Sequence, residues 1–176
     1  AFKGKVRDIY VLDSDKLLIY TSDRISAFDF TFDDPVSDKG IVLTKMAKFW
    51  FDKTKHIVKN HLCETPSDLS SKLKERCMVV TKTKVVPIEA IVRGHLAGSA
   101  WKTYKENKMI NGEVTKDKLD KYEKLNKPIF TPSTKADIGD KDINISKGEM
   151  NKLIGKELAD EISRISLALY DYAYRY

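Results

Sequence analysis

Residues 85–99 read VVPIEAIVRGHLAGS, and this stretch indicates more of the fold than any other. The run of β-branched residues from Val85 to Arg93 predicts a strand. Gly98-Ser99 then opens a short helix, expected over residues 100–106. Arg76–Thr83 has a similar composition and predicts another strand just before this stretch. A strand followed at once by a helix at this point indicates a mixed α and β protein.

The flanking sequence extends this pattern. Lys5–Val11 and Lys16–Tyr20 flank a polar turn and predict a hairpin. The apolar spacing within Ile41–His61 favours an amphipathic helix. Lys127–Ile145 carries two prolines and a glycine and is expected to be mostly loop. Other expectations are an ordered loop over residues 21–34, a tight turn at Asn111-Gly112, and a long helix capped by Ser146 and Glu149 and running toward Tyr176.

The predicted fold class is α+β, with strands early and a long helix last. We expect two units, residues 1–84 and residues 85–176, the second of which ends in the long helix.

Composition excludes several classes of protein. The chain has 176 residues, 41% of them hydrophobic, and a net charge of +6, so a packed core is expected and disorder is not. The two cysteines form no C-x-x-C pair, and the three histidines lack metal-ligand spacing. No apolar run approaches the ~20 residues that span a bilayer. We therefore expect a cytoplasmic protein that does not associate with membranes.

Two stretches of the predicted first unit could bind anions or zwitterions. In Gly4-Lys5-Val6-Arg7-Asp8, alternation along a strand would place Lys5 and Arg7 on one face, toward nucleotide phosphates. The alternative is a basic edge strand without a ligand. Residues 22–29, SDRISAFD, could bind a small zwitterion, with Arg24 pairing with its carboxylate and an aspartate pairing with its ammonium group. The alternative there is a loop tied internally by its own Asp, Arg and Ser side chains.

Two stretches of the second unit are further candidates. Arg93, the Ser99 hydroxyl and nearby helix amides could form a phosphate pocket. The alternative is a buried Glu89–Arg93 pair with Ser99 as a helix cap. Residues 130–142 place one early lysine, Lys135, before three aspartates in a long polar loop, which could hold a phosphoryl group with magnesium or act as a base, or could be a surface loop.

Together these motifs resemble the SAICAR synthetase family over nearly the whole chain. The family's G-K-x-R-D-x-Y opening is similar to residues 4–10, and its S-D-R-I-S-A-F-D loop to residues 22–29. The family's K-G-x-x-L-T…F-W-F helix, P-I-E-x-I-V-R-x-x-x-A-G-S motif and P-I-F-T-P-x-T-K…D-x-N-I-S run follow in order. The resemblance implies a kinase-like N-terminal lobe and an ATP-grasp-like second lobe, with ATP between them.

The resemblance also implies an enzyme of purine biosynthesis. The implied ligase joins L-aspartate to the carboxylate of carboxyaminoimidazole ribotide, with ATP and Mg²⁺, giving SAICAR, ADP and phosphate through an acyl phosphate. Its partners would be these small molecules, with no nucleic acid and no membrane; a homo-oligomer is compatible with it. The implied residues are Gly4, Lys5, Arg7 and Glu89 for ATP; Asp23, Arg24, Ser26, Asp29, Arg93, Gly98 and Ser99 for substrates; and Lys135, Asp142 and Asp140 for catalysis.

Two departures from the family pattern have consequences. Lys141 and Ile143 stand where the family often has histidine and an acidic residue, so no role is carried over to them. Family members continue into a D-x-K-x-E-F-G strand whose acids bind magnesium. We therefore expect the metal ligands beyond Tyr176, and we do not expect this polypeptide alone to be active.

Two other functions compete with this one. A kinase would carry H-R-D and D-F-G motifs, which Ser22-Asp23-Arg24 and Phe28-Asp29-Phe30 do not match. A basic nucleic-acid-binding module would interleave cations with exposed aromatic side chains. The aromatic residues here are expected mostly on apolar faces, which disfavours that module.

Overall fold

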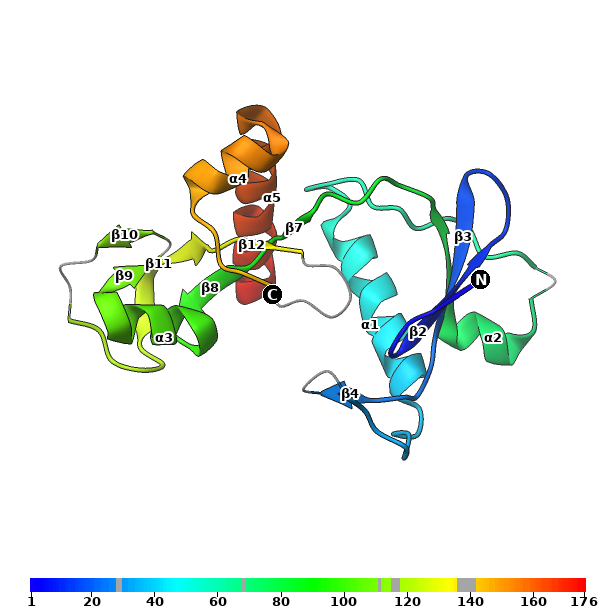
Figure 1. Cartoon of the computed structure of the whole chain (residues 1–176). Coiled ribbons are helices and arrows are strands. Elements are labelled where there is room, and N and C mark those ends of the chain that lie inside the picture. Colours follow the sequence, from blue (N-terminus) through cyan, green and yellow to red (C-terminus); the bar gives the residue numbers. More distant parts are fainter. Residues whose placement is uncertain (28–29, 68, 111, 115–117, 136–141) are drawn as a thin grey trace. The chain divides into compact units, whose positions relative to one another are not determined.

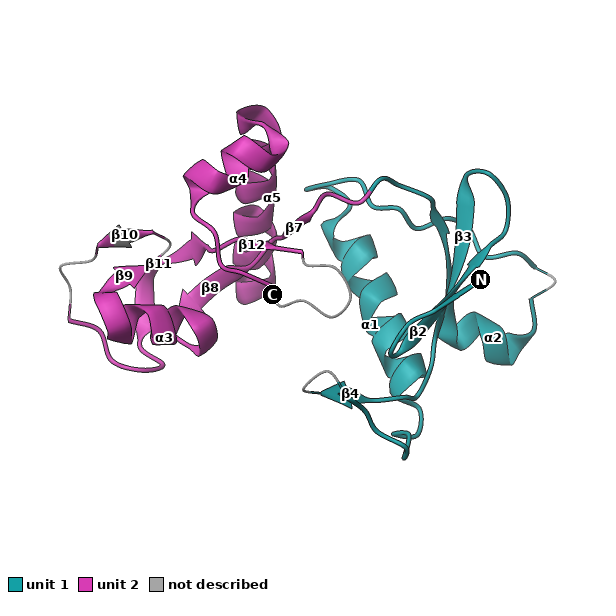
Figure 2. Ribbon diagram, viewed as in Figure 1, with its two compact units in different colours: residues 1–84 teal, residues 85–176 magenta. Residues whose placement is uncertain are grey.

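The computed structural model describes the chain apart from residues 28–29, 68, 111, 115–117 and 136–141 (Figure 1). The chain divides into two compact units, residues 1–84 and 85–176 (Figure 2). The fold is α+β, and all its paired strands in the described ranges are antiparallel.

Unit 1 is built on a four-stranded sheet in the order β1-β2-β3-β6. The strands are β1 (Phe2–Lys3), β2 (Arg7–Val11), β3 (Lys16–Thr21) and β6 (Cys77–Thr81). The predicted hairpin is confirmed as the β2–β3 pair, with Ile9 opposite Ile19. The first four residues of β6 are buried, so this strand supplies much of the apolar interior of the unit. A further short pair joins β4 (Ser26–Ala27) to β5 (Phe30–Thr31).

The helix of unit 1 differs from its prediction in length and in its buried face. Helix α1 runs from Lys39 to Thr54, rather than to His61. The His61 carbonyl instead accepts a 2.8 Å hydrogen bond from the amide of Thr81, beside β6, and that bond holds the segment against the sheet. Gly40 and Thr44 are the buried residues of α1, whereas the apolar side chains Val42, Met46 and Phe49 are exposed. A second helix, α2 (Ser71–Arg76), was not predicted.

Unit 2 contains short strand pairs and three helices in the described part of the chain. The strands are β7 (Ile88–Glu89), β8 (Val92–His95), β9 (Met109–Ile110), β10 (Glu113–Val114), β11 (Lys124–Phe130) and β12 (Ser133–Thr134). β8 pairs with β11, β7 with β12, and β9 with β10. The predicted strand Val85–Arg93 is therefore two strands, because Ala90-Ile91 interrupts it. The expectation of a loop over Lys127–Ile145 was wrong for β11 and β12.

Three helices complete unit 2: α3 (Gly98–Asn107), α4 (Lys147–Ile154) and α5 (Lys156–Arg175). The predicted capping box is present, since the Ser146 hydroxyl accepts from the Glu149 amide and the Glu149 carboxylate accepts from the Ser146 amide. The long helix is broken at Gly155, whose φ of 84° is left-handed and ends α4. Two apolar clusters form the interior: one of Leu96, Ala100 and Tyr104, the other of Phe130, Met150 and Ala159.

Candidate active site

The side chain of Arg93 is the centre of the candidate site in unit 2. Arg93 lies on β8 opposite Ile129 of β11. Its guanidinium donates to the Thr131 hydroxyl at 3.0 Å, to the Ala97 carbonyl at 3.3 Å and to the Ser99 hydroxyl at 2.9 Å. Within the described residues no carboxylate forms an ion pair with this group. The arginine is thus fixed in place by neutral acceptors and keeps its charge uncompensated.

The start of α3 brings Ser99 to this arginine. Gly98 has a φ of 58°, a conformation that costs a residue with a side chain more than it costs glycine. No side chain caps the helix at Ala97, and its first turn holds no acidic residue. The first amides of α3 therefore add partial positive charge beside the Arg93 guanidinium, as in sites that bind phosphate.

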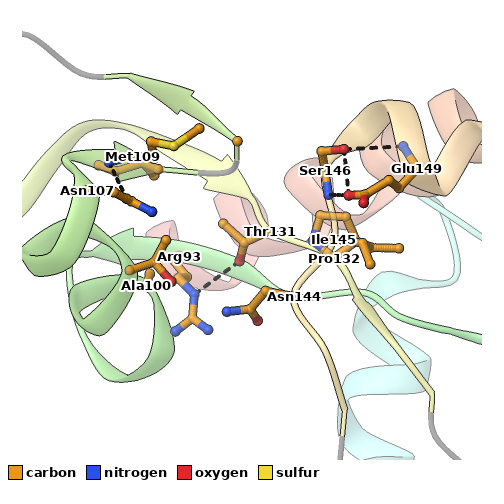
Figure 3. A pocket seen from close by; sticks show the side chains of 13 residues that line it. Arg93, Ala100, Asn107, Met109, Thr131, Pro132, Asn144, Ile145, Ser146 and Glu149 are labelled. Carbon is orange, nitrogen blue, oxygen red and sulfur yellow. Dashed lines mark hydrogen bonds between the residues drawn. The ribbon is translucent and has the colours of Figure 1, made fainter.

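A cavity of about 260 Å³ opens beside Arg93 (Figure 3). Figure 3 shows Arg93, Thr131 and Asn144 gathered at one side and Ser146 with Glu149 at another. The Glu149 carboxylate is occupied by the Ser146 amide at 2.7 Å and the Ser146 hydroxyl at 2.8 Å, and these bonds lower its pKa. The lining thus combines one cation, one carboxylate that already accepts two hydrogen bonds, and hydroxyl, amide and apolar groups, and its Arg93 side suits a small polar anion. Its residues are Arg93, Ala100, Thr103, Asn107, Met109, Ile110, Gly112, Thr131, Pro132, Asn144, Ile145, Ser146 and Glu149.

Two antiparallel segments, residues 132–134 and 143–145, run from the cavity lining toward Lys135 and Asp142. The Ile145 amide donates to the Pro132 carbonyl at 3.0 Å, and the Thr134 amide donates to the Ile143 carbonyl at 2.9 Å. Because Thr134 and Ile143 are held together, Lys135 and Asp142 come next on either segment and flank the same loop. Both side chains are exposed. Asp140 lies outside the described residues.

Glu89 is not paired with Arg93. It lies on β7 opposite Ser133 of β12, and its side chain is exposed. The alternative of a buried Glu89–Arg93 pair is therefore wrong, because the break after Glu89 puts the two residues on different strands. Ser99 is also no helix cap, since its hydroxyl accepts from Arg93 and the N-cap is Ala97.

In unit 1, Lys5 lies in a turn rather than on a strand. The Gly4 amide donates to the Arg7 carbonyl at 2.8 Å, so Lys5 and Val6 are the two central residues of the β1–β2 turn. The expected same-face alternation of Lys5 and Arg7 is thus wrong, because only Arg7 belongs to β2. Both side chains are nevertheless exposed at this end of the sheet.

The loop that follows β3 is tied mainly to other parts of unit 1. Asp23 accepts from the Gly40 amide at 2.8 Å and from Arg76 at 3.1 Å, and these contacts, the first above all, lower its pKa. Arg24 binds Asp8 at 2.6 Å, and the Ser26 hydroxyl donates to the Phe30 carbonyl at 2.8 Å. Asp29 lies outside the described residues. Asp23 and Arg24 bind residues outside this loop and not each other, so the internally tied alternative holds only for the serine side chains, and any substrate role of Asp23 or Arg24 has to compete with these partners.

Sequence reasoning missed several polar residues of these two regions. Thr131 and Asn144 line the cavity, and Asp8 holds Arg24. The Ser133 hydroxyl is buried and has no hydrogen-bond partner among the residues that the structure describes. The only available indication was that Thr131, Ser133 and Asn144 fall within the polar run after Phe130.

A family model for SAICAR synthetase matches residues 1–176. The chain belongs to the SAICAR synthetase family. It is 46% identical to a phosphoribosylaminoimidazole-succinocarboxamide synthase of Methylobacillus flagellatus, over 99% of the chain and 61% of that protein. It is 44% identical to the Halorhodospira halophila synthase, over 98% of the chain and 61% of that protein. The chain thus spans about 60% of the length of these SAICAR synthetases.

Solved SAICAR synthases share the fold. One from Saccharomyces cerevisiae, in complex with SAICAR, has a TM-score of 0.86 and 35% identity, over 97% of this chain and 60% of that one. A second SAICAR synthase has a TM-score of 0.87 and 34% identity, over 98% and 60%.

The rival functions can now be compared with the structure. No helix in the described ranges is both long and apolar enough to cross a bilayer. The aromatic residues are less buried than expected, since Phe2, Phe30, Tyr122, Tyr174 and Tyr176 are all more than half exposed. The burial argument against a nucleic-acid-binding module therefore fails. Family membership, and not burial, distinguishes this chain from both rivals.

Proposed function

We propose that this chain forms part of an ATP-dependent ligase that joins L-aspartate to the carboxylate of carboxyaminoimidazole ribotide. The products are SAICAR, ADP and phosphate. The observation that carries the proposal is Arg93, a half-buried guanidinium held by neutral acceptors beside a polar cavity and a helix N-terminus. Such a group recruits a phosphate, and the ribotide has one. The yeast relative bound to SAICAR supports the same assignment.

The two units take different roles in this proposal. Unit 1 is a kinase-like lobe whose Gly4–Arg7 turn meets ATP phosphates through Lys5 and Arg7. Unit 2 is an ATP-grasp-like lobe in which Arg93, Gly98 and Ser99 hold the ribotide phosphate. Glu89 is an exposed acid that could accept hydrogen bonds from the nucleotide. The protein is cytoplasmic in this proposal, and it binds no nucleic acid.

The chemistry needs the carboxylate oxygen to become a leaving group. A ribotide carboxylate oxygen attacks the γ-phosphorus of ATP, the bond to ADP breaks, and an acyl phosphate forms. The neutral aspartate amine then attacks the acyl carbon, and phosphate leaves with that oxygen. Lys135 neutralises the transferring phosphoryl group, and Asp142 or Asp140 accepts the ammonium proton. Positioning and charge neutralisation supply most of the rate enhancement.

Magnesium belongs to the proposed reaction, but the described residues do not fit a site for it. Among them, no group of three or more His, Cys, Asp and Glu side chains could hold a metal ion. No step is therefore assigned to magnesium here.

Isotope transfer tests the acyl phosphate. With ¹⁸O in the ribotide carboxylate and the full-length protein, each phosphate released should carry one ¹⁸O, because the attacking oxygen leaves with it. Mass spectrometry of the phosphate measures this. The control is unlabelled ribotide in ¹⁸O water, which should give unlabelled phosphate. Phosphate without label from the carboxylate would rule out the acyl phosphate.

A further inference from the structure

The loop after β3 holds the β1–β2 turn from one side. The Arg24 guanidinium donates to the Lys5 carbonyl at 3.0 Å and to the Gly4 carbonyl at 3.1 Å. The Val6 carbonyl accepts from the Ser22 amide at 3.1 Å and from the Ser22 hydroxyl at 2.8 Å. Three consecutive carbonyls of the turn are therefore all occupied by the Ser22–Arg24 segment.

This arrangement also orients the amides of the turn. In a planar trans peptide the N–H points opposite to the C=O. Because the carbonyls of Gly4, Lys5 and Val6 point toward the Ser22–Arg24 segment, the amides of the next residues, through Arg7, point away from it. Successive amides directed to one side form a concavity suited to an anion. The Ser22–Arg24 segment thus fixes the surface that a phosphate would meet.

Arg24 itself contributes no net charge to that surface. Its guanidinium donates two hydrogen bonds to the Asp8 carboxylate, at 2.6 and 3.4 Å. The Arg24 side chain is 27% exposed and the Asp8 side chain 16%. A substrate carboxylate would have to displace Asp8 to reach Arg24. Lys5 and Arg7 are the exposed cations at this turn.

The same segment is anchored to the rest of the unit. The Lys39 ammonium donates to the Arg24 carbonyl at 3.0 Å, and Asp23 accepts from the Gly40 amide at 2.8 Å. A Cβ on Gly40 would lie 3.0 Å from the Ser22 carbonyl oxygen, so α1 and this segment are in direct contact. The turn is therefore connected, through Ser22–Arg24, to the first turn of α1.

We infer that Arg24 and Asp8 are positioning residues: their ion pair holds the β1–β2 turn in the conformation that binds the ATP phosphates. This rests on the proposed function and replaces the expected contact of Arg24 with aspartate. The two possible roles of Asp8 predict opposite changes in ATP affinity when Asp8 is removed. Asp8 is an anion near a site for an anion, so simple charge repulsion predicts that removing it strengthens ATP binding. A positioning role predicts that removing it weakens ATP binding.

The test is Asp8→Asn in the full-length protein, with ADP affinity measured by calorimetry and the KM of each substrate measured separately. The nucleotide affinity should fall by about 5- to 30-fold, the scale of one lost charge-assisted contact, while the KM for aspartate stays unchanged. Asp15→Asn, which removes the same charge from the exposed β2–β3 turn, should leave nucleotide affinity unaltered. Arg24→Lys keeps the charge without the paired hydrogen bonds and should resemble Asp8→Asn.

Three outcomes would overturn the inference. Stronger or unchanged nucleotide binding by Asp8→Asn contradicts it, and so does a rise in the aspartate KM alone in Arg24→Lys. If Asp8→Asn does not fold, Ser22→Ala removes the hydroxyl bond to Val6, and unchanged ADP affinity in that variant contradicts the inference too. If the wild-type protein binds no ADP, it is the proposed function that fails.

Discussion

Replacing Leu96 by Ala should lower the free energy of unfolding by about 2–5 kcal/mol, the range for a fully buried leucine truncated to alanine. Leu96 has no exposed surface and packs with Ala100 and Tyr104, and Trp101, Ile110, Leu119 and Leu125 surround this cluster. The residue follows β8 and precedes α3, so its cluster holds the strand of Arg93 against the helix of Ser99. Urea denaturation followed by circular dichroism measures the change.

The matched control for Leu96→Ala is the same substitution on the surface. Leu153 is 55% exposed on α4, so Leu153→Ala should change the free energy of unfolding by roughly 0.5 kcal/mol or less. Equal losses in the two variants would show that the Leu96 cluster is not the core of unit 2.

Replacing Arg93 by Ala should weaken ribotide binding by ~1.5–3 kcal/mol, which is about 10- to 150-fold in affinity. The guanidinium is the cation of the cavity lining and has no carboxylate partner within the described part of the chain, so a bound phosphate would lose its main charge-assisted contact. Titration of the full-length protein with ribotide measures the effect. Arg93→Lys should lose part of the affinity, because an ammonium cannot reproduce the three-way fork.

Arg164 provides the control for charge alone. It is exposed on α5 of the same unit, and Arg164→Ala removes the same charge. Ribotide affinity should be unchanged in that variant. Unchanged affinity in Arg93→Ala as well would show that the phosphate is bound elsewhere.

Local patterns predicted the local parts of the fold. The β2–β3 hairpin and the Ser146–Glu149 capping box each depend on residues close in sequence, and both are present. The end of α1 could not be predicted, because it depends on the backbone bond from Thr81 to His61. Likewise, the division of Val85–Arg93 into β7 and β8 follows from separate pairing partners, β12 and β11.

The same distinction applies to the candidate site. The sequence indicated Arg93 and Ser99 because they lie six positions apart around a helix start. It did not indicate Thr131, which is 38 positions from Arg93, or the contact of Arg24 with the Gly4 carbonyl, 20 positions away. A charged side chain in a loop gives no indication of which backbone carbonyl it will meet. The prediction that Arg24 binds a substrate therefore rests on its charge and not on its partners in the fold.

The most direct test of the proposed ligase is a substrate-omission assay on the full-length protein. ADP, phosphate and SAICAR should form in equal amounts when ATP, ribotide and aspartate are all present. Leaving out the ribotide should abolish ADP formation, because its carboxylate is the phosphoryl acceptor. ADP formation that continues undiminished without the ribotide, or that yields no SAICAR when all three are supplied, would contradict the account.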